Sequence, residues 1–270
     1  MPSLRAALWL WYRGTRFRGW QRQPHSPTVQ ETVEGELRRC AITSGLAAAG
    51  RTDRGVHARQ QVASLRVPAG TDLTALANSL QGPDWGVAAV AAAPAAFNAQ
   101  WTPSSKEYRY RLSLGAPPLA WAPYVWDVRG DGRLDGARVE PEAVERALAM
   151  ATGTRDFFAF HAASSIRRPR TLSHVELRPY AQGLWELRLT GSGFGRYQAR
   201  ALIGGAALVA AGQLPAEAWR AALEDAERFS GLLAPAHGLV LWALRYGGRG
   251  PFDAEVATHL PDGPPFDGLD

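Results

Sequence analysis

The segment from Ala48 to Ala58 reads A-A-G-R-T-D-R-G-V-H-A and constrains this chain more than any other stretch. Two glycines, Gly50 and Gly55, bracket Asp53, and arginines lie on both sides of that aspartate. Glycine permits positive φ and close backbone approach, so the pattern predicts a tight loop. An aspartate beside glycine commonly forms an Asx-turn, which would make the segment purely structural. The nearby arginines favour a second interpretation, in which the loop handles a polyanion.

The loop lies between a predicted helix and a predicted strand. Thr28 and Glu31 form a capping box, which predicts the start of a helix. Beyond the loop, Gln61 to Val67 alternates and predicts a strand. Regular structure on both sides would hold a functional Asp53 in a fixed position. Apolar residues recur on one face of the helix, and we expect all of them in the core: Val29, Val33, Leu37 and Cys40.

Length and composition exclude several classes of protein. The chain has 270 residues, of which 46% are hydrophobic and 20% charged, so it can bury a sizeable core. It shows no apolar run of membrane length and no secretory signal pattern, which predicts a protein without membrane segments. Cys40 is the only cysteine, which fits a reducing cytoplasm. The six histidines lack the spacing of a zinc site, so we expect no metal.

The basic residues are unusual in kind. The net charge is +5, and every basic residue except Lys106 is an arginine. Guanidinium groups match phosphate oxygens and stack on bases, which favours a nucleic-acid partner. A high-GC coding bias would produce the same excess, so the clusters are more informative than the total. One cluster spans Arg13 to Arg22, and a second contains Arg167, Arg168 and Arg170.

The first cluster overlaps the segment Gly14 to Gln23, where arginines are interleaved with Phe17 and Trp20. Such interleaving suits a loop that tracks a nucleic-acid backbone and stacks bases on its aromatic rings. The alternative is a hairpin that places both rings in the core and its arginines in solvent.

Two later segments carry candidate residues. Ser105 to Leu114 alternates as a strand that places Tyr108 and Tyr110 on one face, and tyrosines in such a strand usually pack in a core. Gly191 to Arg200 precedes an apolar helix and invites a dinucleotide-binding interpretation. Arg196 occupies the position of that fingerprint's last glycine, and no acidic residue follows at the required distance. We therefore do not favour a dinucleotide site.

The segment around Asp53 resembles the G-R-T-D-x-G-V-H-A signature of the tRNA pseudouridine synthase A family. Other segments resemble further motifs of that family in the same order: G-x-x-x-x-G-W-Q-R-Q at Gly14 to Gln23, D-F-x-x-F at Asp156 to Phe160, and the closing G-L-x-L at Gly238 to Leu241. The segment that ends at Arg200 is similar to F-x-R-H-M-V-R. The shared order is more specific than any single motif.

The irregular alternation of strands and helices predicts the α+β class. The resemblance implies a pseudouridine synthase fold, in which two ferredoxin-like halves share a mixed, largely antiparallel sheet with a central cleft. We place an N-terminal half that carries the aspartate loop at residues 1–103 and a C-terminal half at 104–250. An acidic tail rich in proline and glycine follows at 251–270.

The resemblance also implies roles for individual residues. The aspartate of the family signature is catalytic, which implies that role for Asp53. Tyr108 is implied to stack on the target base, and Arg200 to pair with the catalytic aspartate. The implied partners are tRNA and a second copy of the chain, and no cofactor is implied. The residues expected to bind the substrate are Arg16, Arg18, Trp20, Gln21, Arg22, Gln23, Arg51, Thr52, His57 and Leu241.

The implied reaction converts uridine to pseudouridine in the anticodon stem-loop of tRNA, at positions 38–40. An ionised Asp53 would attack C1′ as a nucleophile or remove the proton at C2′ as a base, and the sequence does not separate these routes. Gln100 replaces a basic residue of the family pattern, and Tyr197-Gln198 replaces its His-Met. A catalytically silent or altered-specificity RNA-binding relative therefore stays open. A sugar-bond hydrolase is a third alternative, although it typically needs a second carboxylate, which the loop lacks.

Overall fold

The computed structural model describes residues 2–101, 103–134, 137–180, 183–224, 229–248, 250–252 and 260–267. The chain divides into two compact units, one formed by Met1–Lys106 with Leu241–Asp267 and the other by Glu107–Val240. The chain thus passes from one unit to the other inside two strands, β6 (Ser105–Ser113) and β11 (Leu239–Arg245). The first unit therefore includes a C-terminal segment of the chain as well as the N-terminal one.

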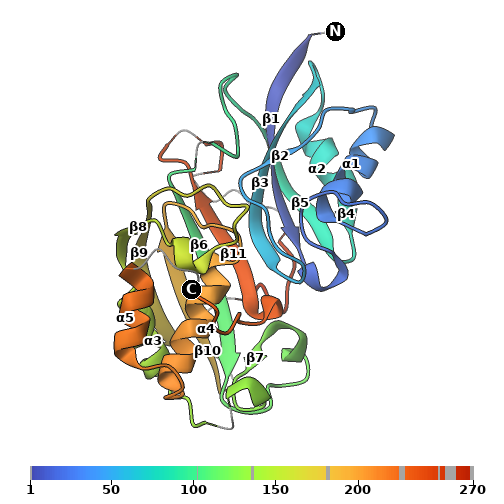
Figure 1. Ribbon diagram of the computed structural model, residues 1–270. Coiled ribbons are helices and arrows are strands. Elements are labelled where there is room, and N and C mark those ends of the chain that lie inside the picture. Colours follow the sequence, from blue (N-terminus) through green and yellow to red (C-terminus); the bar gives the residue numbers. More distant parts are fainter. Residues whose placement is uncertain are drawn as a thin grey trace. The chain divides into compact units, whose positions relative to one another are not determined.

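In the first unit, two helices accompany a sheet with the strand order β4-β5-β1-β3-β11 (Figure 1). The central strand β1 pairs antiparallel with both β3 and β5, and the short β2 pairs with β3. In chain order the elements are β1 (Ser3–Tyr12), η1 (Gly14–Arg16), α1 (Val29–Arg39), β2 (Ala47–Ala48), β3 (His57–Pro68), α2 (Leu73–Ser79), β4 (Gln81–Gly82) and β5 (Trp85–Ala92).

Helix α1 begins where the capping box predicts. The Thr28 side chain accepts a hydrogen bond from the backbone N–H of Glu31 at 3.4 Å, and Val29, Val33 and Leu37 are buried. The prediction for Cys40 is wrong, because the helix ends at Arg39 and the cysteine is exposed. Its sulfur instead lies 3.7 Å from the Oγ of Ser79, the last residue of α2.

In the second unit, the strand order is β6-β10-β9-β8, with α3, α4 and α5 gathered beside it (Figure 1). Strand β9 pairs antiparallel with both β10 and β8, whereas β7 runs parallel to β6. In chain order the further elements are η2 (Ala122–Tyr124), β7 (Trp126–Asp127), η3 (Gly132–Leu134), α3 (Pro141–Ala149), β8 (Gly153–Arg155), η4 (Phe158–Phe160), β9 (Arg170–Pro179), β10 (Leu184–Gly191), α4 (Gln198–Ala210), α5 (Ala216–Glu224) and η6 (Ala236–Gly238).

Both faces of β6 are buried, including the face that carries arginines. Arg111 is fully buried and forms an ion pair with Glu186 of β10 at 2.8 Å, and Arg109 lies 3.4 Å from the same carboxylate. The Arg111 guanidinium also lies over the rings of Trp121 and Tyr180, at 5.4 and 5.0 Å from their centroids. Burial lowers the pKa of Arg111, and the Glu186 carboxylate opposes that effect. A paired, aromatic-covered cluster of this kind keeps buried charges tolerable.

The described part of the C-terminal tail packs on the first unit. Phe252 and Phe266 are buried, and their rings lie edge-on to Trp9 and Trp11 respectively. Residues 253–259 and 268–270 of the expected tail lie outside the described residues. The folded tail residues therefore cover aromatic side chains of β1, the central strand of this unit.

The predicted α+β class is confirmed, and the sheet is mixed because β7 is parallel. Among the described residues, no helix is long and apolar enough to cross a membrane.

Candidate active site

The signature loop connects β2 to β3 and turns sharply at Asp53. The Val56 N–H donates to the Asp53 carbonyl at 3.1 Å, and Gly55 has a φ of +83°. A β-turn with positive φ at its third position favours glycine there. The Asp53 side chain is partly exposed. The turn and the functional interpretation are therefore compatible, because Asp53 keeps part of its surface exposed within the turn.

The segment Gly14 to Gln23 lies directly against this loop. The Trp20 N–H donates to the Thr52 carbonyl at 3.0 Å. Gly19 has a φ of +99°, and a Cβ at that position would lie 2.8 Å from the Thr52 carbonyl oxygen. Glycine is required at this close approach. Two segments with family motifs are thus joined beside Asp53.

Buried hydrogen bonds anchor the loop to strands β1 and β3. The Tyr12 and Thr52 hydroxyls lie 2.9 Å apart, and the Gln61 amide nitrogen donates to the Tyr12 hydroxyl at 3.3 Å. The same amide nitrogen donates to the Gly50 carbonyl at 2.6 Å. Burial raises the pKa of Tyr12 to about 12. The neutral tyrosine therefore ties the residue next to Asp53 to the sheet.

Four of the residues expected to bind substrate have little exposed surface. Trp20 is 2% exposed and packs near Tyr12, which matches the alternative that placed the aromatic rings in the core. His57 is fully buried and accepts a hydrogen bond from the Gly14 N–H at 3.0 Å. Thr52 and Leu241 are also buried. In this structure these side chains support the loop or the core rather than face solvent.

The polar and basic candidates are accessible to differing degrees. Arg16, Arg18 and Arg51 are exposed, and the Arg16 side chain lies 3.6 Å from Asp84 while staying 77% exposed. The exposed Gln23 side chain donates to the Arg18 carbonyl at 3.2 Å. The exposed arginines are available for phosphate contacts.

Tyr108 and Arg200 both belong to the second unit. Tyr108 lies on β6 and is 8% exposed, with its ring edge-on to Phe194 at 5.0 Å between centroids. Arg200 lies in the first turn of α4, which follows Tyr197, a residue with a φ of +71°. The Arg200 guanidinium lies 5.8 Å from the centroid of the Tyr197 ring. The pairing of Arg200 with Asp53, a residue of the first unit, stays a prediction.

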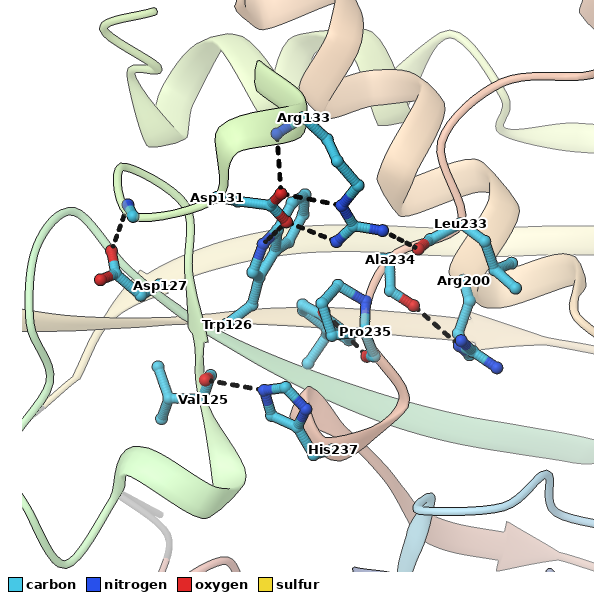
Figure 2. Close-up of polar contacts among 12 residues, drawn as sticks. Val125, Trp126, Asp127, Asp131, Arg133, Arg200, Leu233, Ala234, Pro235 and His237 are labelled. Atoms are coloured by element: carbon cyan, nitrogen blue, oxygen red, sulfur yellow. Dashed lines mark hydrogen bonds and ion pairs between the residues drawn. The ribbon is translucent and has the colours of Figure 1, made fainter. Parts of the chain in front are cut away.

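Figure 2 shows how Arg200 is held within its own unit. Its Nε donates to the Ala234 carbonyl at 2.8 Å. The segment after Ala234 is fixed in turn, because the Tyr110 hydroxyl donates to the Pro235 carbonyl at 3.0 Å. The His237 Nε2 lies 3.1 Å from the Val125 carbonyl. Burial lowers the pKa of His237 and raises that of Tyr110 well above its usual value.

The segment from Val125 to Arg133 supports the same region. Asp131 accepts a hydrogen bond from the Trp126 indole at 2.8 Å and pairs with Arg133. Arg133 also reaches the Leu233 carbonyl at 3.4 Å. Hydrogen bonds from Arg133 lower the pKa of Asp131 to about 2. No motif or periodic pattern in the sequence predicts this support.

The second basic cluster divides into different kinds of residue. Arg170 is buried, and its guanidinium donates to the carbonyls of Ile166, Arg168 and Asp156 at 2.8, 3.2 and 3.4 Å. Its expected contact with phosphate is therefore replaced by a structural role. Arg167 pairs with Asp156 at 2.6 Å, whereas Arg168 is exposed.

Arg196 is exposed and lies against the partly exposed Tyr197, which replaces the histidine of the family pattern. The Arg196 guanidinium lies 4.7 Å from the centroid of the Tyr197 ring and donates to its hydroxyl at 2.8 Å. Within the described part of the chain, no group of three or more His, Cys, Asp or Glu residues is placed to hold a metal ion.

Comparison with known proteins decides the family. A family model described as tRNA pseudouridine synthase matches residues 147–247. A Roseiflexus sp. protein named tRNA pseudouridine synthase A is 31% identical, covering 94% of this chain and 95% of that protein. Proteins of the same name from Chlamydia pneumoniae and Solidesulfovibrio magneticus are 33% and 36% identical, covering 90% and 91% of this chain and 92% of each relative.

The chain belongs to the tRNA pseudouridine synthase A family. The predicted resemblance is thereby confirmed. A solved structure of a Cbf5-Nop10-Gar1 complex is similar at 14% identity with a TM-score of 0.35, over 73% of this chain and 45% of that one. The relatives of the synthase A family match nearly the whole of this chain, including the loop that carries Asp53.

Proposed function

We propose that this protein converts uridine to pseudouridine in tRNA, in the anticodon stem-loop at positions 38–40. The observation that carries the proposal is the match to relatives named tRNA pseudouridine synthase A over 94% of the chain. The partly exposed Asp53 carboxylate in an anchored loop supports the chemical assignment. We further propose that the protein acts in the cytoplasm as a homodimer.

Asp53 starts the reaction in its ionised form. It attacks C1′ of the ribose, or it removes the proton at C2′, and in both routes the N-glycosidic bond breaks. The released uracil turns and rejoins C1′ through C5. The C5 proton then leaves and N1 gains one, and in the second route C2′ also regains its proton, so the product is an isomer of the substrate. No electrons are transferred and no group is added, so the reaction needs no cofactor.

The target uridine must leave the base stack before Asp53 can reach its ribose, which costs a few kcal/mol. Stacking on Tyr108 would offset about 1–3 kcal/mol of that cost. The exposed arginines Arg16, Arg18 and Arg51 supply positive charge for the phosphate backbone. Arg200 would orient the Asp53 carboxylate through a bidentate contact.

The test is tritium release from tRNA transcribed with uridine labelled at C5. The wild-type protein should release tritium, and Asp53→Asn should bind tRNA with unchanged affinity and release none. Asp72→Asn is the matched control, because Asp72 is an exposed cap of α2 and asparagine caps a helix equally well. Free uracil would indicate a hydrolase instead, and binding without either product would indicate a silent RNA-binding protein. Full activity in Asp53→Asn would refute the catalytic assignment.

A further inference from the structure

A pocket of about 400 Å³ lies in the first unit, beside α1. Three parts of the chain line it: the loop residues Gln21 and Arg22, one stripe of α1, and the segment between α1 and β2. Pockets of this size accommodate small organic ligands, so a single nucleotide unit fits within it. The side chains that line the pocket decide which class of ligand it favours.

The stripe of α1 is Gln30, Glu34 and Arg38, which are spaced by four residues and therefore lie on one side of the helix. Glu34 is buried although it carries a carboxylate. Its Oε1 accepts hydrogen bonds from the Gln30 amide at 3.0 Å and the Leu46 N–H at 3.2 Å, and its other oxygen pairs with Arg22. This carboxylate is thus occupied by the protein and organises the wall.

The loop wall is fixed to the helix wall by a second set of contacts. The Gln21 amide nitrogen donates to the Gln30 side-chain oxygen at 3.0 Å, and the Arg22 N–H donates to the same oxygen at 3.2 Å. These bonds leave the Gln21 side-chain oxygen as an acceptor at the pocket. The polar lining is therefore preorganised before any ligand arrives.

The groups left for a ligand are cationic and hydroxylic. Arg38 is exposed, and among the described residues its guanidinium has no ion-pair partner. Arg22 and Arg38 outnumber Glu34, so the charged side chains of the lining sum to +1. Thr43 adds a hydroxyl group, whereas the Ser44 hydroxyl is engaged by the Gly45 carbonyl and the Arg66 N–H. Ile42 is the single aliphatic residue of the lining. A phosphate with polar groups attached suits such a lining better than an apolar molecule.

We propose that this pocket binds one nucleotide unit of tRNA, separate from the uridine that reacts at Asp53. Arg38 and Arg22 contact its phosphate, and Gln21 and Thr43 contact its ribose or base edge. The inference rests on the proposed function, because it takes tRNA as the ligand. It assigns a substrate contact to Arg38 and Thr43, which no family motif identified above contains.

The experiment measures tRNA affinity over a series of salt concentrations for Arg38→Gln and Arg39→Gln. Arg39 is the matched control, because it is the next residue, is exposed, and pairs with Glu36 at 2.8 Å away from the pocket lining. Arg38→Gln should raise Kd about threefold to tenfold and reduce the log–log salt slope by about 0.7–0.9, as expected for one lost phosphate contact. Arg39→Gln should leave both unchanged.

Thr43→Trp provides a second test that removes no charge. Thr43 is exposed at the pocket, so the indole should fill the space without disturbing the core, and Kd should rise as in Arg38→Gln. At subsaturating tRNA, both variants should release tritium more slowly than the wild-type protein, whereas Arg39→Gln should match the wild-type rate. If the wild-type protein is active and both variants bind tRNA with wild-type affinity, the inference about the pocket is wrong while the proposed function stands.

The two proposals fail differently. An inactive wild-type protein would refute the proposed function, whatever the behaviour of the pocket. A second outcome would overturn only the assignment of tRNA as the ligand. In that outcome, inorganic phosphate or uridine monophosphate binds the wild-type protein but not Arg38→Gln, and Arg38→Gln still binds tRNA with wild-type affinity.

Discussion

The Nε atom of Arg200 donates a hydrogen bond to the carbonyl oxygen of Ala234, 2.8 Å away. The guanidinium of the predicted catalytic partner is therefore oriented by the segment from Leu233 to His237, which precedes β11. That segment is itself held by the Tyr110 hydroxyl and by His237. The position of Arg200 therefore depends on Tyr110 and His237, which hold the segment that its guanidinium contacts.

Tyr110→Phe should therefore lower turnover without weakening tRNA binding. The substitution keeps the ring against Trp126 but leaves the Pro235 carbonyl without its donor, which costs about 1 kcal/mol of stability. Tyr246→Phe is the control, since it removes a comparable buried bond to the Ala99 carbonyl at 3.3 Å. Equal turnover losses in the two variants, measured by single-turnover tritium release, would show that Tyr110 has no positioning role.

Arg200 itself should be sensitive to the shape of its cation. Arg200→Ala should reduce the single-turnover rate by roughly a hundredfold, because removal of a hydrogen bond to a charged group costs about 1.5–3 kcal/mol. Arg200→Lys should lose less, since it keeps the charge but not the planar fork. Affinity for tRNA, measured in parallel by filter binding, should change little in both. A fully active Arg200→Ala would remove this residue from the catalytic group.

The stability of the aspartate loop should depend on alkaline pH through Tyr12. Its pKa is about 12 in the folded protein, whereas an unfolded tyrosine ionises near 10. The unfolded chain therefore releases this proton first, and the free energy of unfolding falls as pH rises through that interval. Two pKa units correspond to about 2.7 kcal/mol.

Tyr12→Phe should remove that part of the pH dependence, because phenylalanine does not titrate. Near neutral pH the variant should be about 1 kcal/mol less stable, since Thr52 and Gln61 lose a hydrogen-bond partner. Urea unfolding of both proteins at a series of alkaline pH values checks this. Other tyrosines affect both proteins equally, so parallel curves would contradict the assignment to Tyr12.

Local sequence rules predicted the elements around the loop. Thr28 caps α1 because a threonine oxygen can accept the N–H of Glu31 at that spacing, which is a purely local geometry. The strand β3 was likewise recognisable from its alternation. Gly55 has the positive φ that its place beside Asp53 suggested. These features depend on neighbours within a few residues.

The features that were not predicted depend on partners distant in sequence. Helical spacing placed Cys40 in the core, but the helix ends one residue earlier. Glu34 belongs to a polar pocket only because Leu46 and Arg22 reach it from other segments. Arg170 looked like a phosphate contact until the loop carbonyls that surround it were known. No periodic pattern in the sequence predicts contacts between residues that lie far apart in the chain.

The exposed arginines should differ from Arg170 in their effect on tRNA binding. Arg16 with Arg18, replaced together by glutamine, should flatten the log–log salt slope by roughly one to two units, and Arg168→Gln by about 0.7–0.9. Arg170→Gln should leave the slope unchanged and lower the thermal stability, because its guanidinium satisfies three loop carbonyls. If the double variant of Arg16 and Arg18 leaves the salt slope unchanged, these side chains are only solvated and do not contact phosphate.

Tyr108 has two possible roles, and two variants separate them. Its ring is 8% exposed and lies edge-on to Phe194, so both packing and contact with a flipped base depend on the ring. Tyr108→Phe keeps the ring and loses the hydroxyl, whereas Tyr108→Leu loses both. If the ring stacks on the base, Tyr108→Phe should keep most of its turnover and Tyr108→Leu should fall by at least tenfold, as expected from about 1–3 kcal/mol of stacking.

If the hydroxyl instead accepts the C5 proton, Tyr108→Phe should bind tRNA and stall after the uracil has rejoined the ribose. Single-turnover assays that follow both tritium release and the C1′–C5 product distinguish these outcomes, since a stalled enzyme would hold rearranged tRNA that still carries tritium. Phe194→Leu is the control, because it disturbs the same edge-on packing without touching the tyrosine. Near-native rates in both Tyr108 variants would leave the residue with a packing role only.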